Sequence, residues 1–491
     1  MIYQSTRGGA PASDTAAVLA GIAPDGGLYV DPTLSQRPFD WQGCLSLPPL
    51  AMAEKILHHL LPGFPAMGEL VRRAYAGKFE TEDLTPLVKV GEAHVLELFR
   101  GPTAAFKDVA LSMLPQLVTA ARTQEGVRDK IVILTATSGD TGKAALEGFH
   151  DVEGTGILVF FPADGVSPVQ QAQMVTQTGK NVKVCAVRGN FDDCQSGVKA
   201  AFAAINASGE LNGRGLRLSS ANSINIGRLA PQVVYYFLAY AGLVQDGTLT
   251  LGEPADFVVP TGNFGDILAG YFARLMGLPV GRLVCASNAN RVLTDFLETG
   301  LYDKRRDFLK TSSPSMDILV SSNLERLLYL ASGNDAALVS SLMEQLNTQG
   351  WYKLSGAPFQ RIREVFAAGC CDEGQTRAAI GRVWRDAGYL CDPHTAVAFH
   401  VAEGYAAAHP DHAPLVILST ASPFKFPAAV LAAIGGDLSG DEFDQQERLA
   451  ALTKLPIPAG LRGLREKEVL HRDVIDRSDL LAYVRAQLTR L

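Results

Sequence analysis

Two turns rich in glycine and hydroxyl-bearing residues each join an apolar, strand-like run to a helix-like run. One is TGNFGD at residues 261–266, and the other is TSGDTG at residues 137–142. The first N–H groups of a helix have no partner within the helix, and the helix dipole is positive at that end, so either turn is suited to a phosphate or carboxylate. The alternative is a plain strand-to-helix connection, in which the glycines serve geometry and the hydroxyls cap the helix.

The second turn does not match a nucleotide-hydrolysing P-loop. That motif requires glycine at its first position and serine or threonine directly after its lysine. Here Thr137 occupies the first position, and Ala144 follows Lys143. The turn still offers a set of hydroxyls and N–H groups suited to a small anion.

Two basic residues have neighbours that would suit them to catalysis or to binding an anion. Lys107 begins a predicted helix beside Phe106 and Val109, and a partly buried lysine has a lowered pKa and hence a nucleophilic neutral amine. Arg228 is the only cation in the polar stretch SSANSINIGR, residues 219–228, and a guanidinium can fork onto a phosphate. Spacing alone leaves the ordinary alternatives open, which are a solvated lysine and an arginine that solvates a helix start.

The elements that must position these residues alternate along the chain from about residue 130. The strand candidates are residues 131–134, 156–161, 182–187, 256–259, 283–287 and 415–419. Short apolar strands that alternate with helices predict parallel sheets covered on both faces, an α/β architecture. Residues 1–90 are instead predicted to be mostly helical, and the Gly- and Asp-rich residues 435–446 to form an exposed loop.

The last strand candidate runs into hydroxyl residues in LSTASPFKF, residues 418–426. Ligands of open α/β sheets bind at the carboxyl ends of the strands, so these hydroxyls are candidates for a ligand site. The alternative is an ordinary strand-ending turn at Pro423.

The composition is that of a folded protein with several cores. With 491 residues, 47% hydrophobic and 19% charged, the chain is expected to form two or three domains. The net charge of −7 argues against nucleic acid or an anionic membrane as a main partner. The seven cysteines lack zinc-site spacing, which predicts no metal and a reducing compartment. The sequence shows no signal-peptide core and no apolar run of transmembrane length, so a cytoplasmic location is expected.

Taken together, the chain resembles the threonine synthase family, which are pyridoxal-phosphate (PLP) enzymes of fold type II, over nearly its whole length. The family's motifs occur in the family's order. They are STRG (5–8), APDGGLYV (23–30), FKD (106–108), TSGDTG (137–142), NSIN (222–225), GNFGD (262–266), SMDI (315–318), SSNLERLLY (321–329), DPHTAV (392–397) and STASPFKF (419–426). Departures include Ala105, where many members have serine, and Ile226-Gly227, where they have Trp-Ala. These departures bear on the fit of the substrate.

The resemblance implies two three-layer α/β lobes and an N-terminal, mostly helical domain. The implied boundaries are residues 1–90 for the N-terminal domain, 130–240 for a smaller substrate lobe, and 91–129 with 241–491 for a larger PLP-binding lobe. The cofactor would lie between the lobes, which predicts that they close on substrate binding. The protein would be a monomer or a homodimer.

The resemblance also implies site residues. Pyridoxal 5'-phosphate would be carried as a Schiff base on Lys107, whose freed amine would be the catalytic general base and acid. The remaining cofactor-binding residues would be Gly262, Asn263, Phe264, Gly265 and Asp266, whose backbone holds the phosphate, and Thr420 or its neighbour Ser419, whose hydroxyl faces the pyridine nitrogen. The substrate-binding residues would be Thr137, Ser138, Asp140, Thr141, Asn225 and Arg228.

The implied enzyme is a carbon–oxygen lyase acting on phosphate. It would convert O-phospho-L-homoserine and water into L-threonine and phosphate, the last step of threonine biosynthesis, by γ-elimination followed by addition of water at Cβ. Two alternatives keep the fold and the cofactor: a threonine-synthase-like phospho-lyase and a dehydratase. A third, a non-catalytic small-molecule sensor, is disfavoured because Lys107 is intact.

Overall fold

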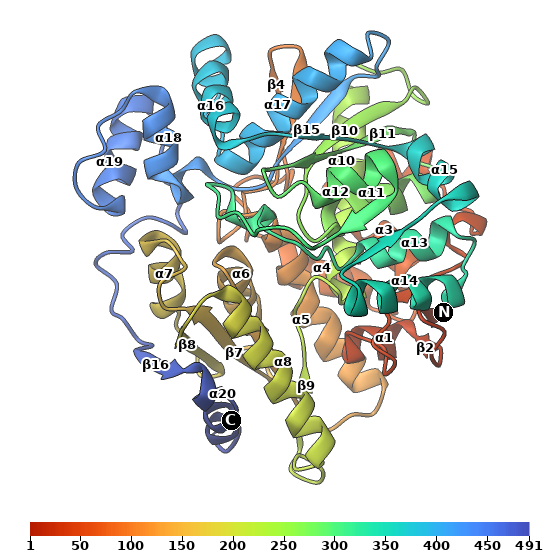
Figure 1. The fold of residues 1–491 in the computed structure, drawn as a ribbon, viewed down its shortest axis with the longest axis vertical. Helices are drawn as coiled ribbons and strands as arrows, with labels where there is room; N and C mark the ends of the chain where they lie inside the picture. Colours follow the sequence, from red (N-terminus) through yellow and green to blue (C-terminus); the bar gives the residue numbers. More distant parts are fainter. Residues whose placement is uncertain (491) are drawn as a thin grey trace.

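A six-stranded sheet forms the centre of the larger lobe in the computed structural model, which describes residues 1–490 (Figure 1). Its order is β14-β11-β10-β15-β5-β4. The strands are β4 (Leu87–Val90), β5 (Ala93–Glu97), β10 (Ala255–Pro260), β11 (Val280–Ser287), β14 (Phe366–Cys370) and β15 (Leu415–Ser419). All neighbours are parallel except β4 and β5, which pair antiparallel.

Successive side chains of β10 are buried against different helices. Val259 packs in a cluster with α10 (Val233–Gln245) and α11 (Gly265–Leu275), whereas Val258 packs in a separate cluster with α17 (Pro393–Ala408). This alternation is expected of a parallel strand covered on both faces. The larger lobe therefore has the three layers that the sequence analysis predicts.

A five-stranded parallel sheet forms the smaller lobe, in the order β16-β8-β7-β6-β9. The strands are β6 (Lys130–Ala136), β7 (Thr155–Pro162), β8 (Val182–Arg188), β9 (Leu216–Ser219) and β16 (Asp473–Asp476). Ile133 packs in the cluster that contains α6 (Asp140–Phe149), and Val132 packs in the one that contains α8 (Phe191–Ser208). This lobe is also three-layered.

The N-terminal region combines helices with a small antiparallel sheet that the sequence analysis does not predict. The sheet has the order β2-β1-β3, with β1 (Ile2–Ser5), β2 (Ala12–Ser13) and β3 (Tyr29–Val30). The helices are α1 (Asp14–Ala20), α2 (Trp41–Leu45), α3 (Pro49–Leu60) and α4 (Met67–Tyr75). Both α1 and α4 pack against α5 (Lys107–Gln124). The N-terminal region thus supports the helix that begins with Lys107.

The structure corrects the implied boundaries at three places. Strand β4 pairs with β5 and so belongs to the larger lobe, not to the region 1–90. Helix α10, which straddles the implied boundary at residue 240, packs against α11 and α3. Strand β16 pairs with β8, and α20 (Leu480–Leu488) packs against α8, so the chain returns to the smaller lobe near its C-terminal end (Figure 1). The pairing of β16 with β8 joins segments remote in sequence, so no local pattern predicts it.

The expected loop at residues 435–446 is partly helical. Helix α19 (Glu442–Thr453) begins within it. The side chain of Asp441 accepts from Asp444 N–H, and the side chain of Asp444 accepts from Asp441 N–H. This reciprocal capping box is a strong helix start.

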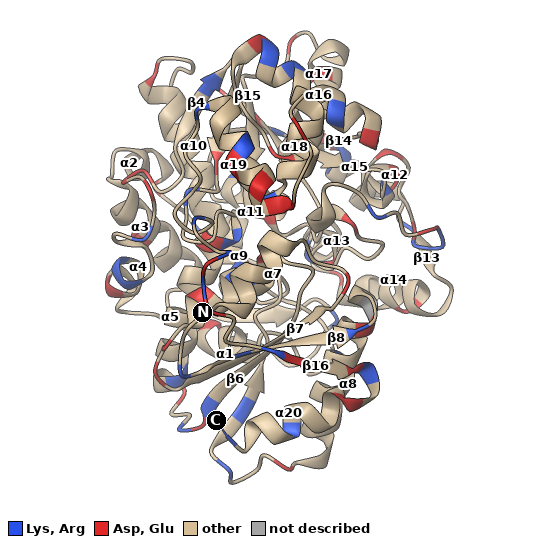
Figure 2. Ribbon diagram, turned by 90° about the vertical axis from the view of Figure 1, so that its left-hand side faces the viewer, with Lys and Arg blue, Asp and Glu red and all other residues tan. Residues whose placement is uncertain are grey.

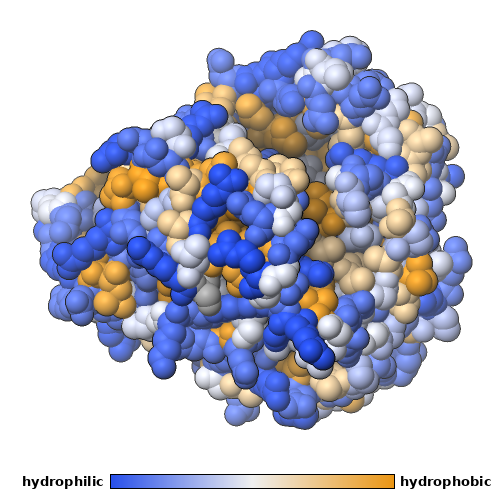
Figure 3. Space-filling model, turned by 90° about the horizontal axis from the view of Figure 1, so that it is seen from below, coloured by the Kyte–Doolittle hydropathy of each residue, from blue (hydrophilic) through white to orange (hydrophobic). Residues whose placement is uncertain are grey.

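The surface is polar and of mixed charge. Basic and acidic residues both occur throughout the ribbon in Figure 2. Hydrophilic residues cover most of the face in Figure 3, and hydrophobic residues form separate patches. Within residues 1–490, no helix is long and apolar enough to cross a membrane. The same part of the chain has no group of three or more His, Cys, Asp or Glu side chains that could hold a metal ion.

Candidate active site

Lys107 is the first residue of α5, and its side chain is only 8% exposed. The segment before it is tied to the end of β15, since Phe106 N–H donates to the Thr420 carbonyl at 2.8 Å. The amine lies 3.7 Å from Asp140 Oδ2 and 3.4 Å from Ser315 Oγ. The predicted lysine is therefore buried among polar groups at the carboxyl end of a central strand.

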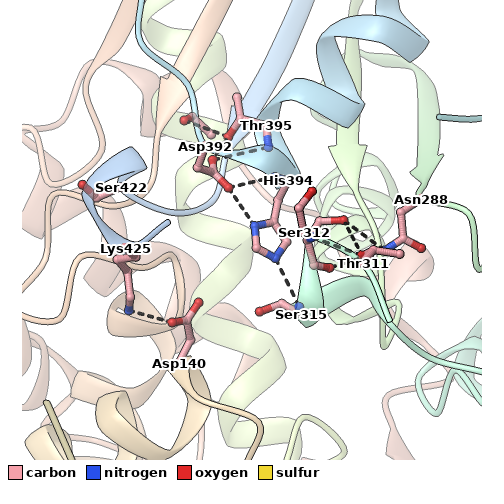
Figure 4. A network of polar contacts seen from close by, with 12 residues as sticks. Asp140, Asn288, Thr311, Ser312, Ser315, Asp392, His394, Thr395, Ser422 and Lys425 are labelled. Atoms are coloured by element: carbon pink, nitrogen blue, oxygen red, sulfur yellow. Dashed lines mark hydrogen bonds and ion pairs between the residues drawn. The ribbon is translucent and has the colours of Figure 1, made fainter. Parts of the chain in front are cut away.

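Asp140 lies between two lysines. Lys425 Nζ is 2.7 Å from Asp140 Oδ1 (Figure 4) and also donates to the Thr103 carbonyl at 3.0 Å. Gln170 Nε2 donates to the same carboxylate oxygen at 2.8 Å. Burial opposes ionisation, but the charges of Lys425 and Lys107 outweigh it and hold the pKa of Asp140 well below its ordinary value. Asp140 is therefore an anion, and it faces lysines rather than solvent.

The surroundings of Lys107 favour a neutral amine. Burial is the largest cause that lowers the pKa of Lys107 from 10.5 to about 8. The charges of Arg228 and Lys425 also lower this pKa, whereas those of Asp140 and Asp108 oppose the shift. An amine that is partly neutral near the working pH can act both as a nucleophile and as a general base.

This amine should therefore react with an acylating reagent at lower pH than an ordinary lysine. In the cofactor-free protein we expect acylation to be slow below and fast above a midpoint of about pH 8, because only the neutral amine reacts. Asp140→Asn removes an anion that stabilises the ammonium form, so its midpoint should be lower still. Labelling measured by mass spectrometry across pH checks both values. The same lysine in urea-unfolded protein is the control, and a midpoint equal to that control would contradict the prediction.

The turn at residues 261–266 joins β10 to α11 and offers unpartnered N–H groups. Its carbonyls point elsewhere: Gly262 O accepts from Ser321 Oγ at 2.8 Å, and Asn263 O accepts from Asn323 N–H at 3.1 Å. The N–H groups of residues 262–264 have no acceptor within residues 1–490. Phe264 has a left-handed φ of 63°, which turns the chain into α11. Consecutive free N–H groups at a helix N-terminus suit a phosphate, as the sequence analysis predicts.

The side chain of Asp266 is not available to bind a phosphate. It accepts from the Tyr235 hydroxyl at 2.5 Å and from the Tyr236 hydroxyl at 3.2 Å. Burial raises the pKa of Asp266 to about 7. Only its backbone N–H, in the first turn of α11, remains suited to a phosphate.

The four predicted substrate residues in the turn after β6 differ in whether their side chains are already engaged. The Thr137 hydroxyl accepts from Gly139 N–H at 3.0 Å and from Gly142 N–H at 2.9 Å, so it shapes the turn itself. The hydroxyls of Ser138 and Thr141 are half-buried and have no hydrogen-bond partner in the described part of the chain. These two are available to an anion, while Asp140 is engaged with the lysines.

The two predicted substrate residues in the segment NSINIGR, Asn225 and Arg228, differ in their hydrogen bonding. Asn225 is fully buried; its amide donates to Val18 O at 3.0 Å and accepts from Gly227 N–H at 2.8 Å, so it caps α9 (Ile226–Leu229) and anchors it to α1. Its predicted contact with substrate would require breaking these bonds. Arg228 donates through one terminal nitrogen to Ala221 O at 2.9 Å, but its Nε is buried without a partner. Burial lowers the pKa of Arg228 to about 10, so it stays cationic with donor capacity to spare.

Of the two hydroxyls at the end of β15, one is engaged and the other is available. Ser419 Oγ lies 3.1 Å from Thr395 Oγ1 and accepts from the Tyr389 hydroxyl at 3.4 Å. The Thr420 hydroxyl has no hydrogen-bond partner within residues 1–490. Thr420 is therefore the better candidate to contact a ligand.

Several residues of the site are given no role by the sequence analysis. They are Gln170, Ser315, Asp392, His394 and Lys425. Four of them, all but Gln170, lie within the motifs SMDI, DPHTAV and STASPFKF. The sequence signal for Lys425 is a lone cation between two phenylalanines, shortly after the hydroxyl residues that end β15.

The chain is similar to threonine synthases in both sequence and structure. A family model described as pyridoxal-phosphate dependent enzyme matches residues 80–421, and one described as threonine synthase, C-terminal, matches residues 395–477. The threonine synthase of Pseudomonas aeruginosa is 41% identical over 92% of this chain and 96% of its own length. The crystal structure of a PLP-bound threonine synthase from Brucella melitensis is 40% identical, with a TM-score of 0.86 and 99% of each chain covered.

A second group of relatives is longer than this chain. The protein called threonine synthase-like 1 in Pongo abelii is 40% identical over 85% of this chain, but the match covers 57% of the relative. The chain thus spans less than two thirds of the length of these curated relatives.

Proposed function

Because this chain belongs to the threonine synthase family of pyridoxal-phosphate-dependent enzymes, we propose that it converts O-phospho-L-homoserine and water into L-threonine and phosphate. The observation that carries the proposal is the buried Lys107 amine, with a pKa of about 8. Ser315 lies between this amine and the Gly262 turn, because Ser315 Oγ is 3.4 Å from the amine and Ser315 O would lie 2.6 Å from a Cβ on Gly262.

The residues present fit pyridoxal phosphate. Lys107 would attach it covalently, the N–H groups of residues 262–264 would hold its phosphate, and the Thr420 hydroxyl would meet its pyridine nitrogen. These groups are a buried amine, unpartnered donors and an unpartnered hydroxyl, all at the carboxyl ends of β10 and β15. When bound, the cofactor supplies an electron sink for negative charge that develops on the substrate carbons.

The chain's own groups would then bind the substrate and move its protons. Lys107 would take and return protons at Cα, Cβ and Cγ as the phosphate leaves and water adds at Cβ. Ser138 and Thr141, at the N-terminal end of α6, would bind the substrate carboxylate, since hydroxyls and the positive helix end favour an anion. Arg228 would bind the substrate phosphate through its unpartnered donors.

Arg228→Ala is expected to weaken substrate binding without loss of the cofactor. Hydrogen bonds to a charged group contribute about 1.5–3 kcal/mol, so KM should rise roughly 10- to 100-fold. Steady-state kinetics with the holoenzyme, and the cofactor absorbance band, check this. Loss of the band would instead show that Arg228 has a structural role, and an unchanged KM would remove it from the substrate site.

The product mixture tests the proposed function. Purified holoenzyme is given O-phospho-L-homoserine, and phosphate, threonine and 2-oxo acid are measured together. Phosphate and threonine in equal amounts are expected. Phosphate with 2-oxo acid would identify a phospho-lyase of the same fold, and 2-oxo acid from unphosphorylated serine or threonine would identify a dehydratase.

The cysteines support a cytoplasmic location, which we also infer. All seven are free thiols; Cys370 is half-buried and the other six are buried. Unpaired thiols persist in reducing compartments. Fractionation of the source cells, with the protein recovered in the cytosol, is the test.

A further inference from the structure

Asp392 and His394 form a buried pair beside Ser315 (Figure 4). Their side chains are 0% and 2% exposed. Asp392 caps the start of α17: its carboxylate accepts from the backbone N–H groups of His394 and Thr395. The same carboxylate lies 2.7 Å from His394 Nδ1. The histidine is therefore fixed at the first turn of a helix that covers the large sheet.

The partners of His394 determine where its ring proton lies. Ser315 N–H is 3.1 Å from His394 Nε2, and a backbone N–H can only donate. Nε2 must therefore carry the lone pair, so Nδ1 carries the proton and donates to Asp392. The ring of Phe426 packs against the imidazole at 5.1 Å and 61°, which also restricts its rotation.

Ser315 contacts two parts of the site. Its hydroxyl accepts from the Lys107 amine at 3.4 Å. Its carbonyl is so close to Gly262 that a Cβ there would lie 2.6 Å away. Ser315 belongs to a single short 3-10 turn, Pro314–Met316, in a long irregular stretch between β12 (Leu301–Asp303) and α13 (Leu324–Ala331). Neither a sheet nor a long helix fixes its backbone.

We propose that His394 is a positioning residue for the reaction, which holds the Ser315 backbone so that Ser315 is placed against both the Lys107 amine and the Gly262 turn. His394 itself contacts none of the reacting groups. Its effect on turnover rests on the proposed function, but its effect on Ser315 does not. Because Ser138, Thr141 and Arg228 lie outside this contact, the loss should fall on kcat more than on KM.

Two substitutions at one position separate the hydrogen bond from the packing. His394→Phe keeps a ring against Phe426 but removes the acceptor, whereas His394→Gln keeps an acceptor at about the position of Nε2. In the Phe variant we expect amide exchange of the peptide that contains Ser315 to be about tenfold faster. We expect kcat to fall about 10- to 100-fold, the loss typical of residues that orient the ligands of a metal site. KM should stay within about threefold. The Gln variant should recover most of both losses.

The control is a histidine elsewhere on α17. His400→Phe, on the same helix and half-buried, should leave exchange near Ser315 and kcat unchanged. The proposal is overturned if a folded, cofactor-bound Phe variant exchanges as slowly as wild type, or if exchange rises while kcat does not fall. If the Phe variant does not fold, Gln is compared with Asn, whose shorter side chain leaves its oxygen out of reach of Ser315; equal exchange in the two would overturn it. A wild-type enzyme that yields 2-oxo acid would refute the proposed function, and the exchange data would still decide the role of His394.

Discussion

Lys107→Ala enzyme is expected to release phosphate from O-phospho-L-homoserine at least about a thousandfold more slowly than wild type. Two contributions are lost together. The variant has no amine to attach the cofactor, and it has no group with a pKa of about 8 to move protons at the substrate carbons. Stopped assays of released phosphate measure the loss, and the absorbance of the dialysed protein reports whether the cofactor is still bound covalently.

Lys143, a partly buried lysine, provides the matched control. Lys143 is 11% exposed and bonds to Glu147 at 2.9 Å, outside the proposed site. Lys143→Ala should keep its cofactor and turn over within about threefold of wild type. If Lys107→Ala retained a tenth or more of wild-type turnover, Lys107 would not be the catalytic residue.

Lys425→Met should be the most destabilising substitution in the site. The Lys425 and Asp140 side chains are 0% and 2% exposed, and their charged atoms are 2.7 Å apart. Removal of the lysine leaves the buried Asp140 carboxylate with the neutral Gln170 amide at 2.8 Å and with Lys107, at the longer distance of 3.7 Å, as its cation. Loss of one partner from a buried ion pair costs about 3–5 kcal/mol. Urea unfolding of the variant and wild type, both with the cofactor bound, should show a fall in the free energy of unfolding of this size.

The double variant distinguishes the charge from the packing. Lys425→Met with Asp140→Asn leaves no unpaired charge in the buried site, so we expect it to be more stable than Lys425→Met alone. The double variant should have low turnover, since it lacks the Asp140 carboxylate that faces the Lys107 amine. The single variants Lys425→Met and Asp140→Asn each lower the free energy of unfolding. If the double variant lowers it by the sum of these two amounts, the two side chains do not interact.

The parts of the fold that could be predicted depend on local pattern. Apolar runs locate the strands, and the residues after them mark the carboxyl ends where Lys107, the Gly262 turn and Thr420 meet. The roles of individual polar residues depend on partners far along the chain. From its motif Asn225 is predicted to bind substrate, but its amide donates to the Val18 carbonyl of α1. Lys425 and His394 gain their roles only from Asp140 and Ser315, which no spacing rule connects to them.

The return of β16 to the edge of β8 has a consequence for synthesis of the protein. Roughly 285 residues separate Arg188, the last residue of β8, from Asp473, the first of β16. At about 5–20 residues per second, a ribosome needs roughly 15–60 seconds to make them. During that time β8 is an unpaired sheet edge on the nascent chain, the kind of edge that pairs with other chains. The smaller lobe can complete its sheet only after all the strands of the larger lobe have been synthesised, since β15 ends at Ser419 and β16 begins at Asp473.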